Sequence, residues 1–110
     1  MNNRTQILEA ELQRILGVIR EKIRPEKVIL FGSLALGNQK SESDIDLLII
    51  QNSNDRIFNR VRKIEELLNR KFAADIIVLT PEEVKMLLDS NNRYLQGILA
   101  NGKVLYERAA

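Results

Sequence analysis

Three short runs rich in apolar residues constrain the fold of this chain more than any other feature. They cover residues 27–31, 43–50 and 74–79, and polar or turn-forming residues bound each of them. Runs of this length are typical of strands. Helical periodicity flanks them, and the first helical face holds Leu8, Leu12, Ile15, Ile19 and Ile23. The alternation predicts an α/β or α+β fold, in which helices pack on a small mixed sheet.

Turn and cap residues predict where the first two helices begin and end. Arg24-Pro25 is expected to end the first helix, because the residue before a proline avoids the helical conformation. After a loop at residues 52–54, a second helix is expected to begin with a cap at Asn54 or Asp55. Its apolar stripe comprises Ile57, Phe58, Val61, Ile64 and Leu68.

The C-terminal third opens with a strong helix signal. Thr80 can cap the helix, Pro81 suits its first position, and Glu83 completes a capping box. Residues 94–99 favour another short helix, which Gly102 is expected to cap rather than form a hairpin turn. With a last strand at residues 103–106, the predicted order is α-β-β-α-β-α-α-β.

The composition excludes several kinds of site. The chain has 110 residues, which predicts one domain spanning residues 1–110. It has no cysteine and no histidine, which excludes disulfides, thiolate or imidazole zinc sites and Ser-His-Asp catalysis. The net charge of +2 does not require a nucleic-acid partner. No apolar run approaches the ~18 residues of a membrane span, so we expect a cytoplasmic protein that does not bind membranes.

Two aspartates lie at the start of the second predicted strand. Asp44 and Asp46 are two residues apart, so on a strand they share one face with Cα atoms ~6.6 Å apart. Two negative charges this close repel each other, and a divalent cation relieves the repulsion. Carboxylate oxygens suit Mg²⁺, which also binds substrate phosphates. The pair therefore indicates a metal site for phosphoryl or nucleotidyl transfer.

Gly32 and Ser33 directly follow the first predicted strand. A glycine lets a phosphate approach the backbone closely, and Ser33 can donate its hydroxyl and N–H to a phosphate oxygen. A helical turn over residues 33–36 would add further free N–H groups. Asp75 is the candidate third acid, because a charged side chain inside an apolar strand needs a metal or another partner.

Each of these features also has a purely structural interpretation. Gly32-Ser33 alone is most simply a strand-to-loop turn. Asp44-x-Asp46 alone can be a polar entry to a strand, and Asp75 can be an ordinary strand-edge residue. Asp89 is an alternative acid, although its place near a helix end favours a solvated side chain. The combination and its spacing, rather than any single residue, favour the catalytic hypothesis.

The second predicted helix and its flanks are enriched in positive charge. The basic residues are Arg56, Arg60, Arg62, Lys63, Arg70 and Lys71. Because Glu65 and Glu66 interrupt them, a solvated face is the simplest interpretation, with contact to RNA or an acidic partner as the alternative. Tyr94 and Tyr106 are expected to pack against neighbours rather than stack on a nucleobase.

Phe31-Gly32-Ser33, then residues 34–43, then Asp44-Ile45-Asp46-Leu47 resembles the signature of the DNA polymerase β-like nucleotidyltransferase superfamily. The likeness covers about residues 28–79, and the short chain is similar to the minimal members, the MNT proteins. That family transfers a nucleotide from a nucleoside triphosphate to a hydroxyl, using Mg²⁺. The resemblance implies that Gly32 and Ser33 hold the triphosphate, for example of ATP. It also implies that Asp44, Asp46 and Asp75 form the catalytic, two-metal Mg²⁺ site.

Minimal members of this superfamily often pair with a HEPN-domain protein, a helical ribonuclease toxin. They act as antitoxins, and some attach AMP to a tyrosine of the toxin, so the resemblance implies a similar partner here. Many members carry arginines after the Gly-Ser pair, where this chain has Leu34 and Leu36. That difference motivates an alternative hypothesis, a binding module that neutralises a toxin by complex formation alone. A third hypothesis is a nucleic-acid-binding protein that uses the basic helix.

Overall fold

The computed structural model describes residues 3–32, 35, 45–69 and 72–109. Its elements are α1 (Asn3–Val18), a π-helical turn η1 (Ile19–Ile23), β1 (Lys27–Phe31), β2 (Ile45–Ile50), α3 (Ile57–Leu68), β3 (Ala74–Leu79), α4 (Pro81–Asp89), α5 (Arg93–Asn101) and β4 (Lys103–Glu107). The predicted order of helices and strands is confirmed. The fold is a single small α+β domain.

The four strands form one mixed sheet in the order β3-β2-β1-β4. β1 runs antiparallel to both β2 and β4, whereas β2 and β3 are parallel. A parallel pair needs a crossover connection, and α3 provides it between β2 and β3. The mixed sheet is therefore as predicted. The expected start of the second strand, at residues 43–44, lies outside the described residues.

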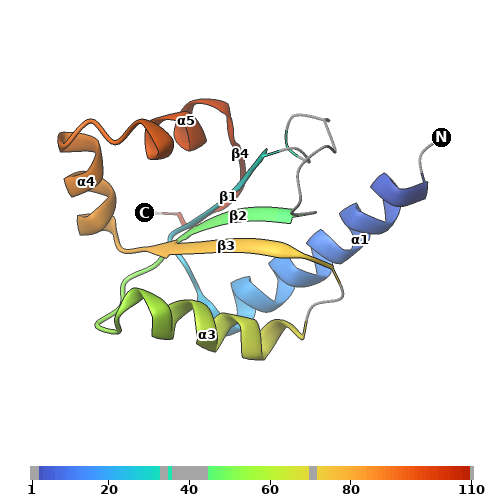
Figure 1. The fold of residues 1–110 in the computed structure, drawn as a ribbon. Helices are drawn as coiled ribbons and strands as arrows, with labels where there is room; N and C mark the ends of the chain where they lie inside the picture. Colours follow the sequence, from blue (N-terminus) through green and yellow to red (C-terminus); the bar gives the residue numbers. More distant parts are fainter. Residues whose placement is uncertain (1–2, 33–34, 36–44, 70–71, 110) are drawn as a thin grey trace.

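Helices cover both faces of the sheet. Figure 1 shows α1 and α3 on one face, with α4 and α5 on the other. The α1/α3 face buries a cluster that includes Leu8, Ile15, Leu47, Ile64 and Val78. The α4/α5 face buries Ile29, Leu48, Leu79, Leu95 and Ile98. Alternate residues of the central strands thus point into different clusters, and this alternation decides on which face each polar strand residue lies.

The helix ends agree with the sequence in most places. Arg24 takes a left-handed conformation with φ of 53° and ends the first helix before Pro25. Thr80 forms the expected capping box with Glu83, and Gly102 caps α5. The predicted cap of α3 at Asn54 or Asp55 is wrong. The N-cap residue is Arg56, whose side chain makes no capping hydrogen bond.

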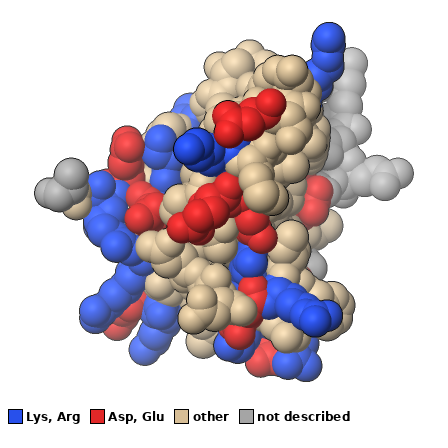
Figure 2. All heavy atoms as spheres, turned by 90° about the vertical axis from the view of Figure 1, so that its left-hand side faces the viewer, with Lys and Arg blue, Asp and Glu red and all other residues tan. Residues whose placement is uncertain are grey.

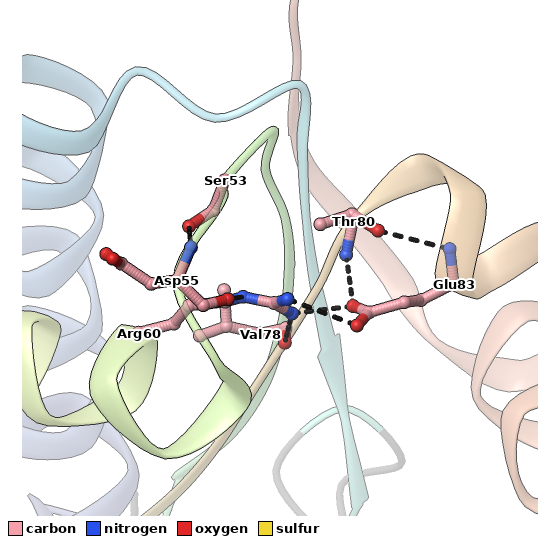
Figure 3. Close-up of polar contacts among 6 residues, drawn as sticks. All are labelled: Ser53, Asp55, Arg60, Val78, Thr80 and Glu83. Carbon is pink, nitrogen blue, oxygen red and sulfur yellow. Dashed lines mark hydrogen bonds and ion pairs between the residues drawn. The ribbon is translucent and has the colours of Figure 1, made fainter.

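Arg60 joins α3 to β3 and α4, as Figure 3 shows. Its side chain is buried, and it forms an ion pair with Glu83 in which Nη1 lies 2.6 Å from Oε1. It also donates hydrogen bonds to the backbone carbonyls of Asp55 and Val78. The expectation that Arg60 belongs to a solvated basic face is wrong, because the loop before α3, strand β3 and the start of α4 together supply acceptors for all of its guanidinium nitrogens.

Two further surface features bear on the alternatives. Phe58, expected to widen the apolar stripe of α3, is instead 76% exposed. Figure 2 shows the end of the molecule where α4 and the C-terminus lie, and positive and negative side chains are intermixed across that face. Among the described residues, no helix is long and apolar enough to cross a membrane.

Candidate active site

Phe31, Asp46 and Asp75 form one row across the sheet. Phe31 is the cross-strand partner of Asp46 on β1, and Asp46 is the partner of Asp75 on the parallel strand β3. Since Leu48 and Ile77 lie two residues further along their strands and pack on the α4/α5 side, both acids point to that face. The fold thus places Asp75, the candidate third acid, beside Asp46 on the neighbouring strand.

The two acids differ in exposure. Asp46 is buried, with 6% of its surface exposed, whereas Asp75 is exposed. The argument that Asp75 needs a partner because it is buried is therefore wrong. This difference suits a site that must stay open to substrate. The buried carboxylate of Asp46 is held in place, and the exposed carboxylate of Asp75 is accessible to an entering substrate.

The distance between these acids explains why the site suits a cation. Partner residues on neighbouring strands have backbones about 4.8 Å apart, so two ionised carboxylates on one face repel each other. Hard oxygen donors of this kind fit Mg²⁺. Ser33 and Asp44, the other predicted ligands, lie outside the described residues. Within the described part of the chain, no three acidic side chains gather around one point as a metal site.

Gly32 lies directly against the Asp46 carboxylate. It has φ of +74°, a conformation that favours glycine, and a Cβ atom there would overlap Asp46 Oδ2 and lie 3.0 Å from Asp46 Cγ. The sequence suggested that this glycine makes room for a phosphate. In the fold, the space that a side chain would need is already occupied by the aspartate, so Gly32 and Asp46 are a matched pair.

Tyr94 is a site residue that the sequence did not reveal. It is 54% exposed, and its ring meets the Phe31 ring edge to face, with centroids 6.2 Å apart. Burial, the charge of Asp75 and then that of Asp46 raise the pKa of Tyr94 above its ordinary value of 10.0. The expectation of a packing role is incomplete, because the phenol lies within reach of both carboxylate charges. Only the α5–sheet contact brings these residues together.

Other candidates lie away from the row. Asp89 is the exposed last residue of α4 and takes no part in the Phe31–Asp46–Asp75 row. A cavity of about 580 Å³ lies at the opposite end of β1 and β2, where Lys27 pairs with Ile50. Of the predicted site residues that the structure describes, namely Gly32, Asp46 and Asp75, none lines that cavity. The row of acids is therefore the candidate site.

Known proteins resemble this chain in sequence. The family model described as polymerase beta, nucleotidyltransferase matches residues 13–110. A candidate protein adenylyltransferase of Methanocaldococcus jannaschii is 31% identical over 100 residues, which cover 89% of this chain and 97% of that protein. A second candidate protein adenylyltransferase of that organism is 32% identical over 85 residues. These residues cover 74% of this chain and 58% of that relative.

Solved structures share the fold. A crystal structure of a candidate nucleotidyltransferase from Sulfolobus solfataricus has a TM-score of 0.66 at 19% identity, covering 96% of this chain and 86% of that one. A chain of the MntA–HpeT toxin–antitoxin crystal structure has a TM-score of 0.55 at 22% identity, covering 88% and 72% of the two chains. At these identities, the likeness concerns the fold alone.

Proposed function

This chain belongs to the polymerase β nucleotidyltransferase family, and from that premise we propose that it transfers AMP from ATP to a hydroxyl of a partner protein. The single observation that carries the proposal is the in-register pair of Asp46 and Asp75 on one face of the sheet, with Gly32 against Asp46. The family membership makes the chain a nucleotidyltransferase. The nucleotide, the acceptor and the residue roles are our proposal.

Asp46 and Asp75, together with Asp44, are proposed as ligands of Mg²⁺. The bound cation would neutralise the negative charge of the triphosphate and of the carboxylates. Gly32 and Ser33 are proposed to hold the triphosphate, because backbone N–H groups that follow a strand can bind phosphate oxygens. Burial fixes the Asp46 carboxylate, so it is suited to positioning, whereas exposed Asp75 is accessible to an entering acceptor.

The proposed step is an in-line displacement at the α-phosphorus. The acceptor oxygen forms a bond to the α-phosphorus while the bond between that phosphorus and the bridging oxygen of the β-phosphate breaks. Pyrophosphate leaves with the electron pair, and the acceptor proton passes to the Asp75 carboxylate. The products are an adenylylated hydroxyl and pyrophosphate.

The proposed acceptor is a HEPN-type toxin, which the modification would inactivate, making this chain an antitoxin. Three observations support a protein acceptor. The sequence resembles the minimal nucleotidyltransferases, the relatives in Methanocaldococcus jannaschii carry the name of protein adenylyltransferases, and the fold matches a chain from a toxin–antitoxin complex. The requirement for ATP is consistent with action in the cytoplasm.

Labelled ATP tests the reaction type. The protein is incubated with Mg²⁺, a co-purified HEPN toxin and ATP labelled on either the α- or the γ-phosphate. We expect the α-label, and not the γ-label, to become attached to protein, and we expect Asp46→Asn and Asp75→Asn to abolish the labelling. Protein labelled from γ-labelled ATP would identify a kinase instead, and absence of both labels would refute the proposal.

Growth rescue separates catalysis from masking. Wild type and the Asp46→Asn/Asp75→Asn double variant are expressed together with the toxin, and their complexes are recovered by affinity purification. Under our proposal, the double variant still binds the toxin but no longer restores growth. Restored growth with the double variant would instead favour the alternative, in which the chain neutralises the toxin by complex formation alone.

A further inference from the structure

A recess opens beside Gly32, on the side of Asp46 that faces away from Asp75. It has a volume of about 170 Å³ and is lined by Phe31, Gly32, Gly97, Ile98, Asn101 and Gly102. The sheet order β3-β2-β1-β4 puts Asp75 on one side of Asp46, and Phe31 on the other. The recess is therefore continuous with the proposed site through Gly32, which touches the Asp46 carboxylate.

The size of the recess indicates that it holds one part of a ligand. Sites that enclose a whole small molecule have volumes of ~300–1,000 Å³, and this one is smaller. Among the residues that the structure describes, its wall contains no Lys or Arg, so these side chains offer no charge to bind phosphates. Phe31 and Ile98 supply aromatic and apolar surface, and the amide of Asn101 can both donate and accept a hydrogen bond. Apolar walls with one such amide fit a nucleoside.

The recess and the proposed entry point of the acceptor lie on opposite sides of Asp46. In an in-line displacement, the acceptor and the leaving pyrophosphate lie on opposite sides of the α-phosphorus. Asp75 is exposed at the β3 end of the row. An acceptor that gives its proton to Asp75 must enter there. The β1 side, with Gly32 and the recess, is left for the nucleoside triphosphate.

We propose that the recess lined by Phe31, Gly97, Ile98 and Asn101 binds the nucleoside end of the substrate, with its phosphates outside the recess at Gly32 and Asp46. This inference rests on the proposed function, and it assigns to α5 the contacts that distinguish a nucleotide from bare triphosphate. In this arrangement, the Phe31 ring supplies an aromatic wall on which a flat heterocycle stacks, and Asn101 hydrogen-bonds to the base or the ribose.

Gly97 keeps the recess open. It lies inside α5, where glycine is less favourable than alanine by about 1 kcal/mol, yet a Cβ built on it meets nothing within 4 Å. Its backbone therefore does not require glycine. Gly102, by contrast, packs so closely that a Cβ would collide with Ile29 and with the Ile98 carbonyl. A larger side chain at position 97 can fill the recess without straining the fold.

Because position 97 tolerates a larger side chain, the proposal can be tested by calorimetry with two probes, Mg²⁺·ATP and Mg²⁺·tripolyphosphate. The Gly97→Leu variant is expected to bind ATP at least about tenfold more weakly, which corresponds to 1.4 kcal/mol, with unchanged affinity for tripolyphosphate. Its melting temperature is expected to rise. The matched control is Gly17→Leu on α1, because a Cβ there also meets nothing within 4 Å and α1 covers the opposite face (Figure 1).

Two further variants keep the test decisive. If Gly97→Leu does not fold, Gly97→Ala and Asn101→Ala replace it, and each should weaken ATP but not tripolyphosphate binding. The inference is overturned if ATP binding is unchanged in these variants, or if both probes weaken equally. If wild type binds neither probe, the proposed function itself fails, which is a distinct result.

Discussion

Gly32 and Asp46 fit together so closely that a Cβ atom on the glycine would overlap the carboxylate of the aspartate. Gly32 also has φ of +74°, which costs a residue with a side chain about 1–2 kcal/mol. Gly32→Ala should therefore destabilise the protein by about 2–3 kcal/mol in urea unfolding. Gly17→Ala is the control and should be neutral or stabilising by up to about 1 kcal/mol. Equal stabilities for the two variants would contradict the packing described here.

The position of Tyr94 near Asp75 and Asp46 leads to a prediction about the pKa of its phenol in variants of these acids. Burial and the charges of Asp75 and Asp46 raise the pKa of Tyr94 above 10.0. In a Tyr106→Phe background, Tyr94 is the remaining tyrosine, so its ultraviolet titration can be followed directly. Asp75→Asn should lower the pKa of Tyr94 more than Asp46→Asn does, and neither should restore 10.0, because burial remains. An unshifted titration in both variants would remove Tyr94 from the site.

Replacing Arg60 is expected to cause a large loss of folding stability. Its guanidinium lies in the interior between α3, β3 and α4 and pairs with Glu83 at 2.6 Å (Figure 3). Breaking a buried pair from one side costs about 3–5 kcal/mol. Because Glu83 is partly exposed, we expect Arg60→Ala to cost less than or only as much as the lower end of that range, at about 2–3 kcal/mol by chemical denaturation. Exposed Arg62 is the control, and Arg62→Ala should cost less than about 0.5 kcal/mol. Similar losses would contradict the assigned role of Arg60.

The same ion pair predicts an acid-sensitive stability. The hydrogen bond from Arg60 holds the pKa of Glu83 below its ordinary value of 4.5. A lowered pKa in the folded state contributes stability above pH 4.5, and this contribution is lost as the pH falls through the folded pKa. Glu83→Gln should therefore flatten the decline of unfolding free energy below pH 4.5. Glu82→Gln, on the same helical turn, should leave the decline as in wild type, and identical profiles for the two variants would argue against the coupling.

The features that could be predicted from the sequence are those formed by residues close together in the chain. The capping box at Thr80 and the stop at Arg24-Pro25 involve residues close in the chain, and both appear in the fold. The acid Asp46 and the glycine Gly32 could be selected because strand ends and spacing are visible in sequence. Their mutual contact could not, since it requires the register in which Phe31 pairs with Asp46.

Arg60 and Tyr94 were misjudged because their contacts join segments that are distant in the sequence. Arg60 looked like part of a solvated basic face, because its partner Glu83 lies in another helix. Tyr94 looked like a packing residue, because only the docking of α5 on the sheet brings it to Phe31. Asp75 was chosen for its supposed burial but is exposed at the site. Periodicity in the sequence shows which residues share one face of a helix or strand. Tertiary packing determines which residues of other helices and strands that face contacts.

Calorimetric titration of ATP into the protein, with and without Mg²⁺, tests the central claim most directly. Wild type should bind ATP only with Mg²⁺, and Asp46→Asn should lose that binding because the ligand set at Asp46 and Asp75 is broken. The exposed acid Asp89 provides the matched control, and Asp89→Asn should bind as wild type does. Unchanged, metal-independent binding in Asp46→Asn would contradict the assignment of this row of acids as the active site.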